Sequence, residues 1–532
     1  MAIKLTRAKN PEEVGISSKV INDFLTTIEE ENVNIHSFMV IRHGKVAAEC
    51  YRAPFTADRP HAMYSVSKTF TATAIGIAEG EGLLSLNDLV KDYFPDYTKD
   101  LNDPRLEKLT IKHLITMSSG KDPSLLNDKS KCDWIEYFFR CPWYAEPGEQ
   151  YKDISENIYM LCAILTRVTG MSVRDYLQPR LFEPLGIDYP FWETDINGIE
   201  AGGWGLYAKT EDVAKLMLCY QNNGRFRNKQ IIPEEFAKAA HQAQTDNSAN
   251  SYADSKNGYG YCLWLCGMPN TYRCDGMFSQ FGIVFEDYDA LLVITAAIPP
   301  EQEARDFLWR FFPAAFLDET KNNGNTAVEG LKERLKNAVL ELPEKKGNIP
   351  VKQALIDGRT IHFNKKIFLN LIGFPTSMLP LAVTYMTTDK AGNIDNVKFT
   401  FGKNDLTMYW TEGDESNTVK AGMNGHFTYG EMRLGGIDYK VCCTAKWKKD
   451  DTLFVQVRPI ETIGKRMLDF RFLKGGKVTM KPSGSPTILE IGRSLVLGLG
   501  DLTDSKLIIG AAGKAIHLLP LILEPTHRGK IK

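Results

Sequence analysis

The sequence predicts a mixed α+β protein of two domains: an antiparallel sheet with a helical subdomain, followed by a small antiparallel β-barrel or sandwich. Three observations predict it. The chain has 532 residues, too many for one hydrophobic core. Its first 330 residues or so alternate helical and strand patterns, whereas short strands dominate later. A polar linker bounded by Pro343 and Pro350 separates the two regions. We therefore place the domains at 1–330 and 351–532, joined by a helix and linker at 331–350.

The expected elements of the first domain follow from hydrophobic periodicity. A strand pair at 37–46 turns at His43-Gly44, and an amphipathic helix at 69–81 ends at Gly82. Two further helices have apolar faces, and β-branched and aromatic residues favour core strands. We expect these two helices at 158–168 and 213–220, and the strands at 259–264 and 282–297. A third helix at 306–316 would pack back on the strands.

The second region begins with a charged helix at 331–342. Short apolar runs separated by Gly, Asn and Asp turns then predict the strands of a barrel or sandwich. The runs are 397–401, 406–409, 427–429, 439–445, 452–457, 468–472 and 477–480.

Composition excludes several classes of function. Hydrophobic residues make up 43% and charged residues 24%, and the net charge of -2 gives no field for nucleic acid or an anionic membrane. The segment Met1–Glu13 lacks an apolar core typical of signal peptides, and the ten cysteines contain no CxxC pair. We expect a cytoplasmic protein with free thiols and a small-molecule substrate.

One apolar stretch could change that expectation. Residues 507–523 are largely apolar but carry Lys514, His517 and Pro520. A membrane-spanning helix needs about 20 apolar residues with few charges. We interpret the stretch as a buried terminal strand or helix, with membrane contact as the alternative.

Several familiar motifs are missing. The sequence has no Walker A loop, no complete GxGxxG between a strand and a helix, and no HExxH or other histidine cluster. It also lacks the GxSxG nucleophile elbow. We therefore predict neither a cofactor nor a metal.

The pattern S-x-x-K remains, and it occurs twice, at Ser65–Lys68 and Ser118–Lys121. Ser65 opens a predicted helix, so Lys68 lies on the same face with its Cβ about 5–6 Å away and can take the hydroxyl proton. The helix N-terminus also favours a developing oxyanion. Ser118 precedes Gly120 and indicates a turn after a helix. The alternative for Ser65 is an N-cap serine followed by a solvated Lys68.

Longer segments carry a family resemblance. The run at 63–76 (MYSVSKTFTATAIG) with 81–88 (EGLLSLND) resembles the first box of the serine β-lactamase family, in its class C-like branch of esterases, D-aminopeptidases and 6-aminohexanoate-dimer hydrolases. Later segments resemble the same family in the same order, over roughly residues 10–315. They are 110–120 (TIKHLITMSSG), Pro147-Gly148 with 157–170 (NIYMLCAILTRVTG), 181–187 (LFEPLGI) and 201–206 (AGGWGL).

The resemblance implies acyl transfer through a serine ester. Ser65 would attack a carbonyl, Lys68 would act as base, and backbone N–H groups, including that of Ser65, would stabilise the oxyanion. The second box departs from the family. Its usual tyrosine position falls on Asp153, with Ser155 in the third place and Tyr151 two residues before. Asp153 would replace the phenol as base or ion partner of Lys68, or Tyr151 would turn inward, or Asp153 would merely cap the next helix.

The third box also departs from the family. The stretch 272–281 (YRCDGMFSQF) resembles the YxxxGxxGQ variant of esterase and amidase members, with Gly276 and Gln280 retained. The backbone from Gly276 to Phe278 would supply the second oxyanion donor. The family's basic residue is missing, which disfavours a β-lactam as substrate. Arg273 would be a substitute anion site or a plain surface residue.

We therefore expect a serine hydrolase acting on a small ester, amide or peptide. The alternatives are a ligand-binding pseudoenzyme of the same fold and an acyltransferase that uses the same acyl-enzyme. The segments 444–455 (TAKWKKDDTLFV) and 460–462 (IET) resemble the lipocalin-like barrel that trails such domains. That barrel would cover the active-site mouth or hold a small ligand.

Overall fold

The computed structural model describes residues 3–123, 133–317, 328–345, 347–364, 392–499, 513 and 516–532. The chain divides into two compact units. One unit contains the described residues up to Ala338 apart from Ala53–Phe55, and the other contains Ala53–Phe55 and the described residues from Val339 onward. Each unit is described by itself.

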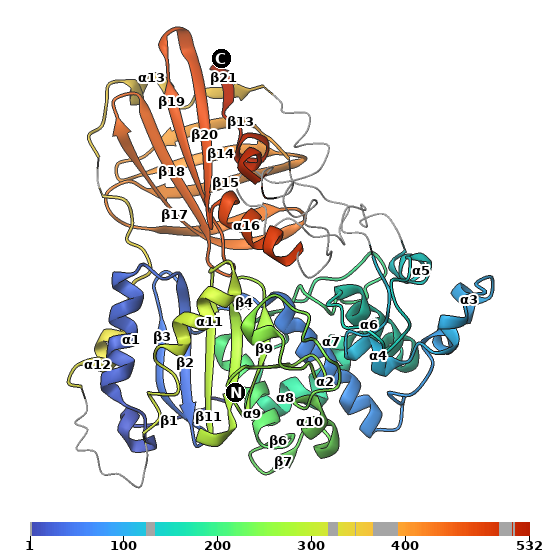
Figure 1. Ribbon diagram of the computed structural model, residues 1–532. Coiled ribbons are helices and arrows are strands. Elements are labelled where there is room, and N and C mark those ends of the chain that lie inside the picture. Colours follow the sequence, from blue (N-terminus) through green and yellow to red (C-terminus); the bar gives the residue numbers. More distant parts are fainter. Residues whose placement is uncertain are drawn as a thin grey trace. The chain divides into compact units, whose positions relative to one another are not determined.

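The first unit is built on a sheet whose strands follow the order β1-β3-β2-β11-β10-β9-β8 (Figure 1). All its pairings are antiparallel except that of β1 with β3. Helices cover both faces, so the central strands are buried throughout. The strands are β1 (Thr6–Arg7), β2 (Ile35–Arg42), β3 (Lys45–Tyr51), β8 (Trp264–Leu265), β9 (Thr271–Gly276), β10 (Gln280–Phe285) and β11 (Ala290–Ala296).

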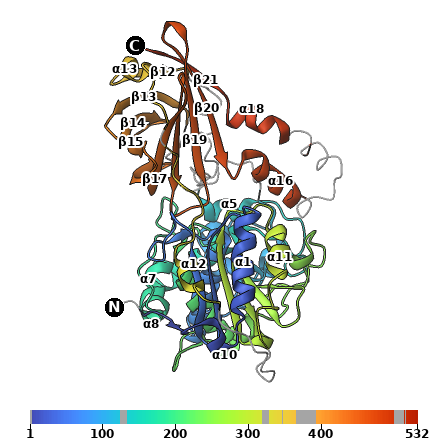
Figure 2. The same cartoon turned by 90° about the vertical axis from the view of Figure 1, so that its left-hand side faces the viewer.

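One face of this sheet packs against α1 (Ser18–Glu30) and α11 (Glu301–Trp309), which lie side by side in Figure 2. Phe24 of α1 contacts Phe38 of β2 and Phe307 of α11, with ring centroids 5.1 and 5.7 Å apart. The other face packs against α9 (Thr210–Gln221), and a Cβ added to Gly282 would lie 2.8 Å from Met217 Cγ. The mixed α+β class is confirmed.

The helical part of this unit surrounds α2 (Ser67–Gly80), in which every residue from Ser67 to Ala78 is buried. We expected an amphipathic helix here. Because other helices pack around α2, even its threonines are buried, and they hydrogen-bond inward. The neighbours of α2 are α6 (Ser155–Thr169), α7 (Val173–Leu177) and α10 (Glu234–Ala240), while α4 (Ile111–Ile115) and α5 (Trp134–Arg140) pack against α6.

Four elements differ from the prediction, and one of them, the strand expected at 282–297, is divided into β10 and β11 by a turn at Glu286–Tyr288. Residues 259–263 form no strand, because Cys262 has a φ of +56° and only isolated bridges occur there, so the strand β8 begins at Trp264. The helix expected at 306–316 is α11, which starts at Glu301 and ends at Trp309; Pro313 follows shortly after in a turn. The helix expected at 331–342 is the shorter α12 (Leu331–Lys336).

The second unit is a barrel of strands in the order β15-β14-β13-β12-β21-β20-β19-β18-β17-β16 (Figure 1). The first and last strands meet, since Asn417 of β15 exchanges two hydrogen bonds with the backbone of Arg433 of β16. The strands are β12 (Thr360–Phe363), β13 (Ile394–Phe401), β14 (Asp405–Glu412), β15 (Glu415–Gly422), β16 (Thr428–Leu434), β17 (Ile437–Lys449), β18 (Thr452–Pro459), β19 (Lys465–Phe472), β20 (Lys477–Ser485) and β21 (His527–Ile531).

Part of the apolar stretch 507–523 lies outside the described residues, namely 507–512 with 514 and 515. The remainder forms a short 3₁₀ turn and α18 (Leu519–Leu523), in which Leu518 and Leu521 are 54% and 71% exposed. The expectation of burial is wrong for these two residues. Within the described ranges, no helix combines the length and apolar character needed to cross a membrane.

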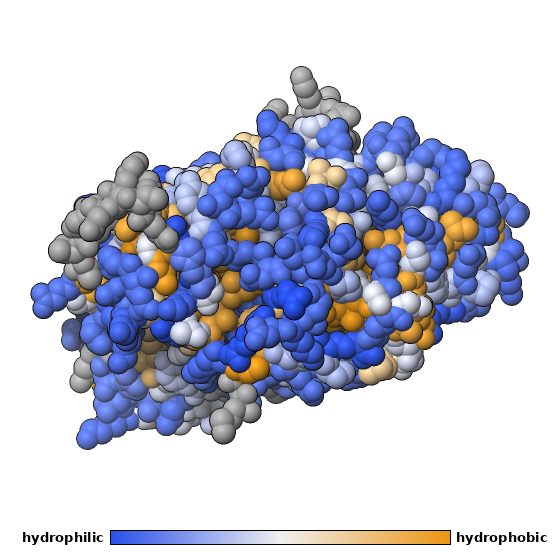
Figure 3. Space-filling model, turned by 90° about the horizontal axis from the view of Figure 1, so that it is seen from below, coloured by the Kyte–Doolittle hydropathy of each residue, from blue (hydrophilic) through white to orange (hydrophobic). Residues whose placement is uncertain are grey.

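Other exposed large apolar side chains include Leu342, Ile349, Val351 and Leu355. On the face seen in Figure 3, hydrophilic residues dominate and apolar ones form small separate areas. The cysteines that the structure describes are all buried and free, so none of them forms a disulfide. Within the same residues, no group of three His, Cys, Asp or Glu side chains is placed to hold a metal ion.

Candidate active site

Ser65 lies in a tight turn that leads directly into the buried helix α2. The 3₁₀ turn Tyr64–Val66 precedes α2, and Tyr64 has a φ of +47°, which is uncommon for a bulky residue. Ser67 Oγ donates to the Tyr64 carbonyl at 2.6 Å and accepts from the Leu206 N–H at 3.2 Å. Such strain persists only where surrounding contacts enforce it, and it concentrates at functional sites.

Lys68 follows one turn after Ser65 and forms an ion pair with Asp153. The ammonium Nζ donates to Asp153 Oδ1, and the two side chains are 6% and 34% exposed. The prediction that Asp153 is the ion partner of Lys68 agrees with this geometry. The capping alternative is wrong, because the N-cap of α6 is Ile154 and no side chain caps that helix.

Tyr151, the other predicted candidate, is half-buried among aromatic rings. Its ring centroid lies 5.2 Å from that of Tyr259 and 5.7 Å from that of Trp264. Burial raises the pKa of Tyr259 well above its ordinary value. The nearby Tyr151 and the charge of Asp153 add to this rise. Both candidates of the second box therefore lie around Tyr259, and Asp153 is the one paired with Lys68.

The second S-x-x-K has a structural role that sequence reasoning left unassigned. Ser118 lies in the turn after α4, as predicted, and Lys121 is fully buried. Lys121 Nζ donates to the carbonyls of Phe139 and Cys141 at 2.9 and 3.2 Å, and it lies 3.8 Å from the Trp143 ring centroid. Burial lowers the pKa of Lys121 to about 8.

The backbone around Lys121 also holds the segment that ends at Asp153. Gly148 N–H donates to the Ser118 carbonyl at 2.7 Å, and Lys152 N–H donates to the Met117 carbonyl at 2.8 Å. Lys152 Nζ forms an ion pair with Asp122 Oδ1 at 2.5 Å. These contacts fix the residue immediately before Asp153, so the second motif positions the carboxylate that pairs with Lys68.

The third-box strand β9 approaches the Ser65 turn so closely that only glycine fits at its end. A Cβ on Gly276 would lie 2.4 Å from the Met63 carbonyl oxygen and 3.2 Å from the Val66 nitrogen. The turn that follows contains two successive residues of positive φ, Phe278 at +63° and Ser279 at +73°. Gly276 therefore brings the β9 backbone beside the nucleophile candidate.

Two predicted residues of this turn have their polar groups engaged within the protein. Phe278 N–H donates to Glu301 Oε1 at 2.8 Å. The buried amide of Gln280 donates to the carbonyls of Phe278 and Ala296 at 3.2 and 2.8 Å and accepts the Ala296 N–H at 3.1 Å. Gln280 thus braces the turn through the backbone, which is a different role from the substrate contact we expected.

Ser155 begins α6 and lies over the glycine pair of the segment Ala201–Leu206. A Cβ on Gly203 would be 2.8 Å from Ser155 Cβ, and one on Gly202 would be 2.5 Å from Cys162 Sγ. The two glycines therefore allow this segment to run against α6. Ser155 therefore lies between this segment and the rest of α6, two residues after Asp153. Its contact with a substrate stays a prediction.

Arg273 requires a correction. It is fully buried, donates to Asp275 Oδ2 at 2.8 Å and to the Asp254 carbonyl at 2.7 Å, and belongs to a cluster with Arg305. It is therefore neither an anion site nor a surface residue. The partners are separated along the chain by up to 51 positions, so only tertiary packing reveals the cluster.

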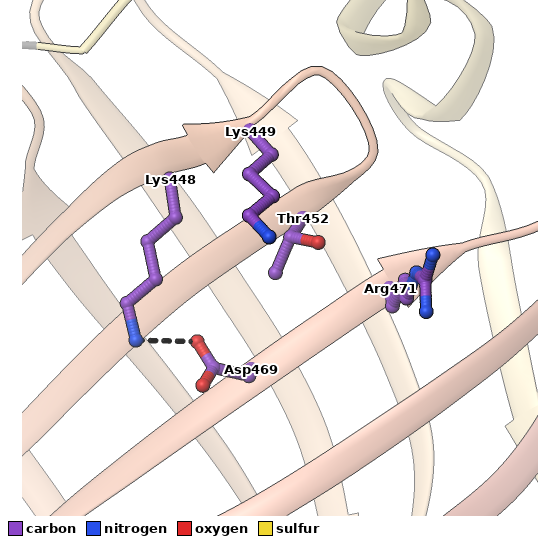
Figure 4. A pocket seen from close by; sticks show the side chains of 5 residues that line it. All are labelled: Lys448, Lys449, Thr452, Asp469 and Arg471. Carbon is purple, nitrogen blue, oxygen red and sulfur yellow. Dashed lines mark ion pairs between the residues drawn. The ribbon is translucent and has the colours of Figure 1, made fainter.

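The barrel offers a different kind of hollow, shown in Figure 4. Its volume is about 330 Å³, and Lys448, Lys449, Thr452, Asp469 and Arg471 line it. Lys448 pairs with Asp469 at 2.8 Å, while Arg471 pairs with Asp451 at 2.9 Å. These are exposed or half-exposed side chains on β17–β19, and the two acidic–basic pairs are ordinary surface ion pairs. We therefore place the candidate chemistry in the first unit.

The chain is similar in sequence or in fold to several known proteins. The β-lactamase from Escherichia coli K12 is 28% identical over 172 residues, 30% of this chain and 44% of its own length. The 6-aminohexanoate-dimer hydrolase from Paenarthrobacter ureafaciens is 24% identical over 259 residues, 43% of this chain and 64% of its own. A penicillin-binding protein structure from Bacillus halodurans has 16% identity and a TM-score of 0.43, covering 54% of this chain and 98% of its own.

The chain thus spans 44% and 64% of the length of these two curated relatives, which is less than two thirds of either. The sequence profile of the β-lactamase family matches residues 29–311, which is more than half of the chain. That range contains Ser65, Lys68, Asp153 and the strand ending at Gly276. The chain therefore belongs to the β-lactamase family.

Proposed function

We propose that this protein is a serine hydrolase that cleaves a small ester, amide or peptide through an acyl-enzyme on Ser65. The single observation that carries the proposal is the Lys68–Asp153 ion pair, located one helical turn from Ser65. A nucleophile, a base on the same helix face and a third group orienting that base form the arrangement that activates serine hydroxyls. The hydrolase members of the family support the same chemistry.

The proton moves through the pair as a unit. As Ser65 Oγ bonds to the substrate carbonyl carbon, its proton passes to Lys68 Nζ, while Lys68 gives one proton to the Asp153 carboxylate. The pair returns a proton to the leaving alcohol or amine when the bond to that group breaks. Water then attacks the ester on Ser65, and the same groups carry its proton to Ser65 Oγ.

Two backbone groups are suited to the oxyanion. The Ser65 N–H lies at the positive start of α2, and the Met277 N–H follows Gly276, whose close approach to Met63 and Val66 brings β9 to the turn. The neighbouring Phe278 N–H is engaged by Glu301. Met277 is therefore our choice within the range from Gly276 to Phe278.

A β-lactam is not our choice of natural substrate. The third box lacks the family's basic residue, and the guanidinium of Arg273 nearby is buried and paired with Asp275. A penicillin carboxylate would have no counter-charge from either. An ester or amide without that carboxylate fits the available groups better.

A fluorophosphonate probe tests the proposal directly. The wild type and Ser118→Ala should both be labelled, and Ser65→Ala should not, because Ser118 belongs to the structural copy of the motif. Intact mass should show one adduct, located at Ser65 by peptide mapping. Equal labelling of Ser65→Ala, or none of the folded wild type, would overturn the assignment. Product analysis with and without added alcohol distinguishes hydrolysis from acyl transfer.

A further inference from the structure

Two helices lie in the chain between the barrel strands β20 and β21. The first, α16 (Ile488–Leu499), begins directly after β20, and the second, α18, ends four residues before β21 begins. The two helices pack tightly, because a Cβ on Gly492 of α16 would lie 2.6 Å from Leu519 Cδ1 and 2.8 Å from Ile516 Cγ1. Figure 2 shows both helices beside the barrel.

The second of these helices also exposes large apolar side chains to solvent. Leu518, Leu521 and Ile522 are 54%, 71% and 41% exposed. Their spacing of three and four residues places them on one face of the helical segment, which we call the α18 face. An apolar group of this kind beside polar residues is typical of an interaction site.

The strands that adjoin these helices form a basic surface. β12, β20 and β21 contain no Asp or Glu, and Lys477, Arg528 and Lys530 are exposed on β20 and β21. Lys477 and Lys530 are directly opposite each other across the two strands. Like charges in this position destabilise a sheet, so its own stability does not explain the arrangement.

The acidic residues of the adjoining strands do not neutralise this surface. Asp469 of β19 pairs with Lys448 at 2.8 Å, and one carboxyl oxygen of Asp395 in β13 is buried. Lys481 is opposite Asp469 on β20, so we do not count it among the basic residues of the surface. The positive charge of Lys477, Arg528 and Lys530 is therefore available to an anion from outside the chain.

The apolar and basic features adjoin each other along the chain. Arg528 is the second residue of β21, and Lys530 follows two residues later. Since a strand rises by about 3.4 Å per residue, the Lys477–Lys530 pair lies about 10 Å from the start of β21, where the chain arrives from α18. This is about one Debye length at physiological salt, so charge and apolar contact can act on one partner.

An anionic lipid bilayer fits both features. Its hydrocarbon accepts apolar side chains, and its headgroups attract Lys and Arg. A nucleic acid would use the basic residues alone, and an apolar protein partner would leave the opposed lysines without a counter-charge. The net charge of -2 gives no sign of this surface, because acidic residues elsewhere in the chain offset it.

We propose that the α18 face and the basic residues Lys477, Arg528 and Lys530 together form a docking surface for an anionic lipid bilayer. The apolar side chains enter the boundary between headgroups and acyl chains, while the cationic groups contact lipid phosphates and carboxylates. The helix lies on the bilayer and does not cross it. This inference is independent of the chemistry at Ser65.

Co-sedimentation of the full chain with vesicles tests the basic residues. Binding should be tighter to phosphatidylcholine vesicles with about 30% phosphatidylserine than to phosphatidylcholine alone, and it should weaken as salt is added. Replacing the three basic residues by Gln should weaken binding by about 100-fold. A matched control removes three lysines on other parts of the same unit and should change binding far less: Lys403→Gln, Lys420→Gln and Lys440→Gln.

The apolar residues are tested by a second set of variants. Leu518→Ser combined with Leu521→Ser should weaken binding to the anionic vesicles by at least about tenfold, because less apolar surface enters the bilayer. Val351→Ser combined with Leu355→Ser is the control, since both residues are exposed in the same unit. Leu521→Trp should add fluorescence that brominated acyl chains quench, and Val351→Trp should not.

Circular dichroism and fluorophosphonate labelling should match the wild type in every variant, which keeps this test separate from the assignment of Ser65. Equal binding to both kinds of vesicle, or equal losses in the target and control variants, would overturn the proposal. Absence of vesicle binding by the folded wild type would do the same. Binding of a DNA duplex in place of vesicles would assign the basic residues to nucleic acid instead.

Discussion

Glu301 holds the third-box turn by a hydrogen bond from the Phe278 N–H to its Oε1, at 2.8 Å. Glu301 is the first residue of α11, and burial raises the pKa of its carboxyl. The bond reaches a residue of positive φ, one position after Met277. It therefore controls the conformation of the backbone segment that we assign to the oxyanion.

Replacing Glu301 tests this control. Glu301→Ala removes the acceptor and frees the Phe278 peptide, so kcat should fall by at least about tenfold with a smaller change in KM. Glu301→Gln keeps an amide oxygen in the same place and should retain most of the activity. Steady-state kinetics of both variants measure the difference. Similar losses in the two variants would assign the effect to the charge rather than to the hydrogen bond.

A second pair of variants distinguishes whether Asp153 or Tyr151 relays the proton. Asp153→Asn preserves the shape but removes the proton acceptor beside Lys68, so kcat should fall by about 10²–10⁴-fold. Tyr151→Phe removes only a hydroxyl and should change kcat by less than about tenfold if Asp153 is the working group. The rate of fluorophosphonate labelling measures both without knowledge of the substrate. The opposite order would assign the proton relay to Tyr151.

Lys121 should contribute to stability and to the placement of Asp153. Lys121→Met keeps much of the aliphatic stem but leaves the carbonyls of Phe139 and Cys141 without their donor, which should cost about 1–3 kcal/mol of unfolding free energy. Urea unfolding measures this cost. Because the folded-state pKa of Lys121 is lowered to about 8, its contribution should become more favourable as pH rises from about 8 towards 10.5, and the variant should lack that rise.

Local sequence signals predicted much of the fold and the central pair of the site. The Ser65–Lys68 spacing, the helix around it and the strands β2, β3 and β10 follow from periodicity and turns. Family spacing placed Asp153 opposite Lys68. Each of these signals lies within a short window of the chain, so the sequence alone contains it.

The misplaced elements depend on contacts between distant segments. Residues 259–264 have the composition of a strand, but the positive φ of Cys262 interrupts it. Gln280 resembles a substrate ligand in sequence, although its amide is consumed by the backbone of Ala296 and Phe278.

The barrel contains an ion pair whose loss should be costly. Arg466 donates to both oxygens of Glu412 at 2.8 and 2.6 Å, with at most 1% of either side chain exposed. Glu412→Ala should destabilise the barrel by about 3–5 kcal/mol, because it leaves a buried guanidinium without its carboxylate. Replacing both residues by Met should cost much less. Calorimetry of the three proteins measures the contrast, and equal losses would show that packing rather than charge explains it.

The buried carboxyl of Glu193 should also make stability depend on pH. Its folded-state pKa of about 7 exceeds the ordinary value of 4.5, so the folded protein holds a proton that the unfolded chain releases. Its contribution is fully present below about pH 4.5 and is lost as pH rises through about 7, a change of at most about 3 kcal/mol. Glu193→Gln cannot ionise. The difference in melting temperature between the variant and the wild type should therefore grow in the variant's favour from pH 4.5 to 7.5. A difference that stays constant across this range would mean that the carboxyl is already ionised in the folded protein, with a counter-charge close by.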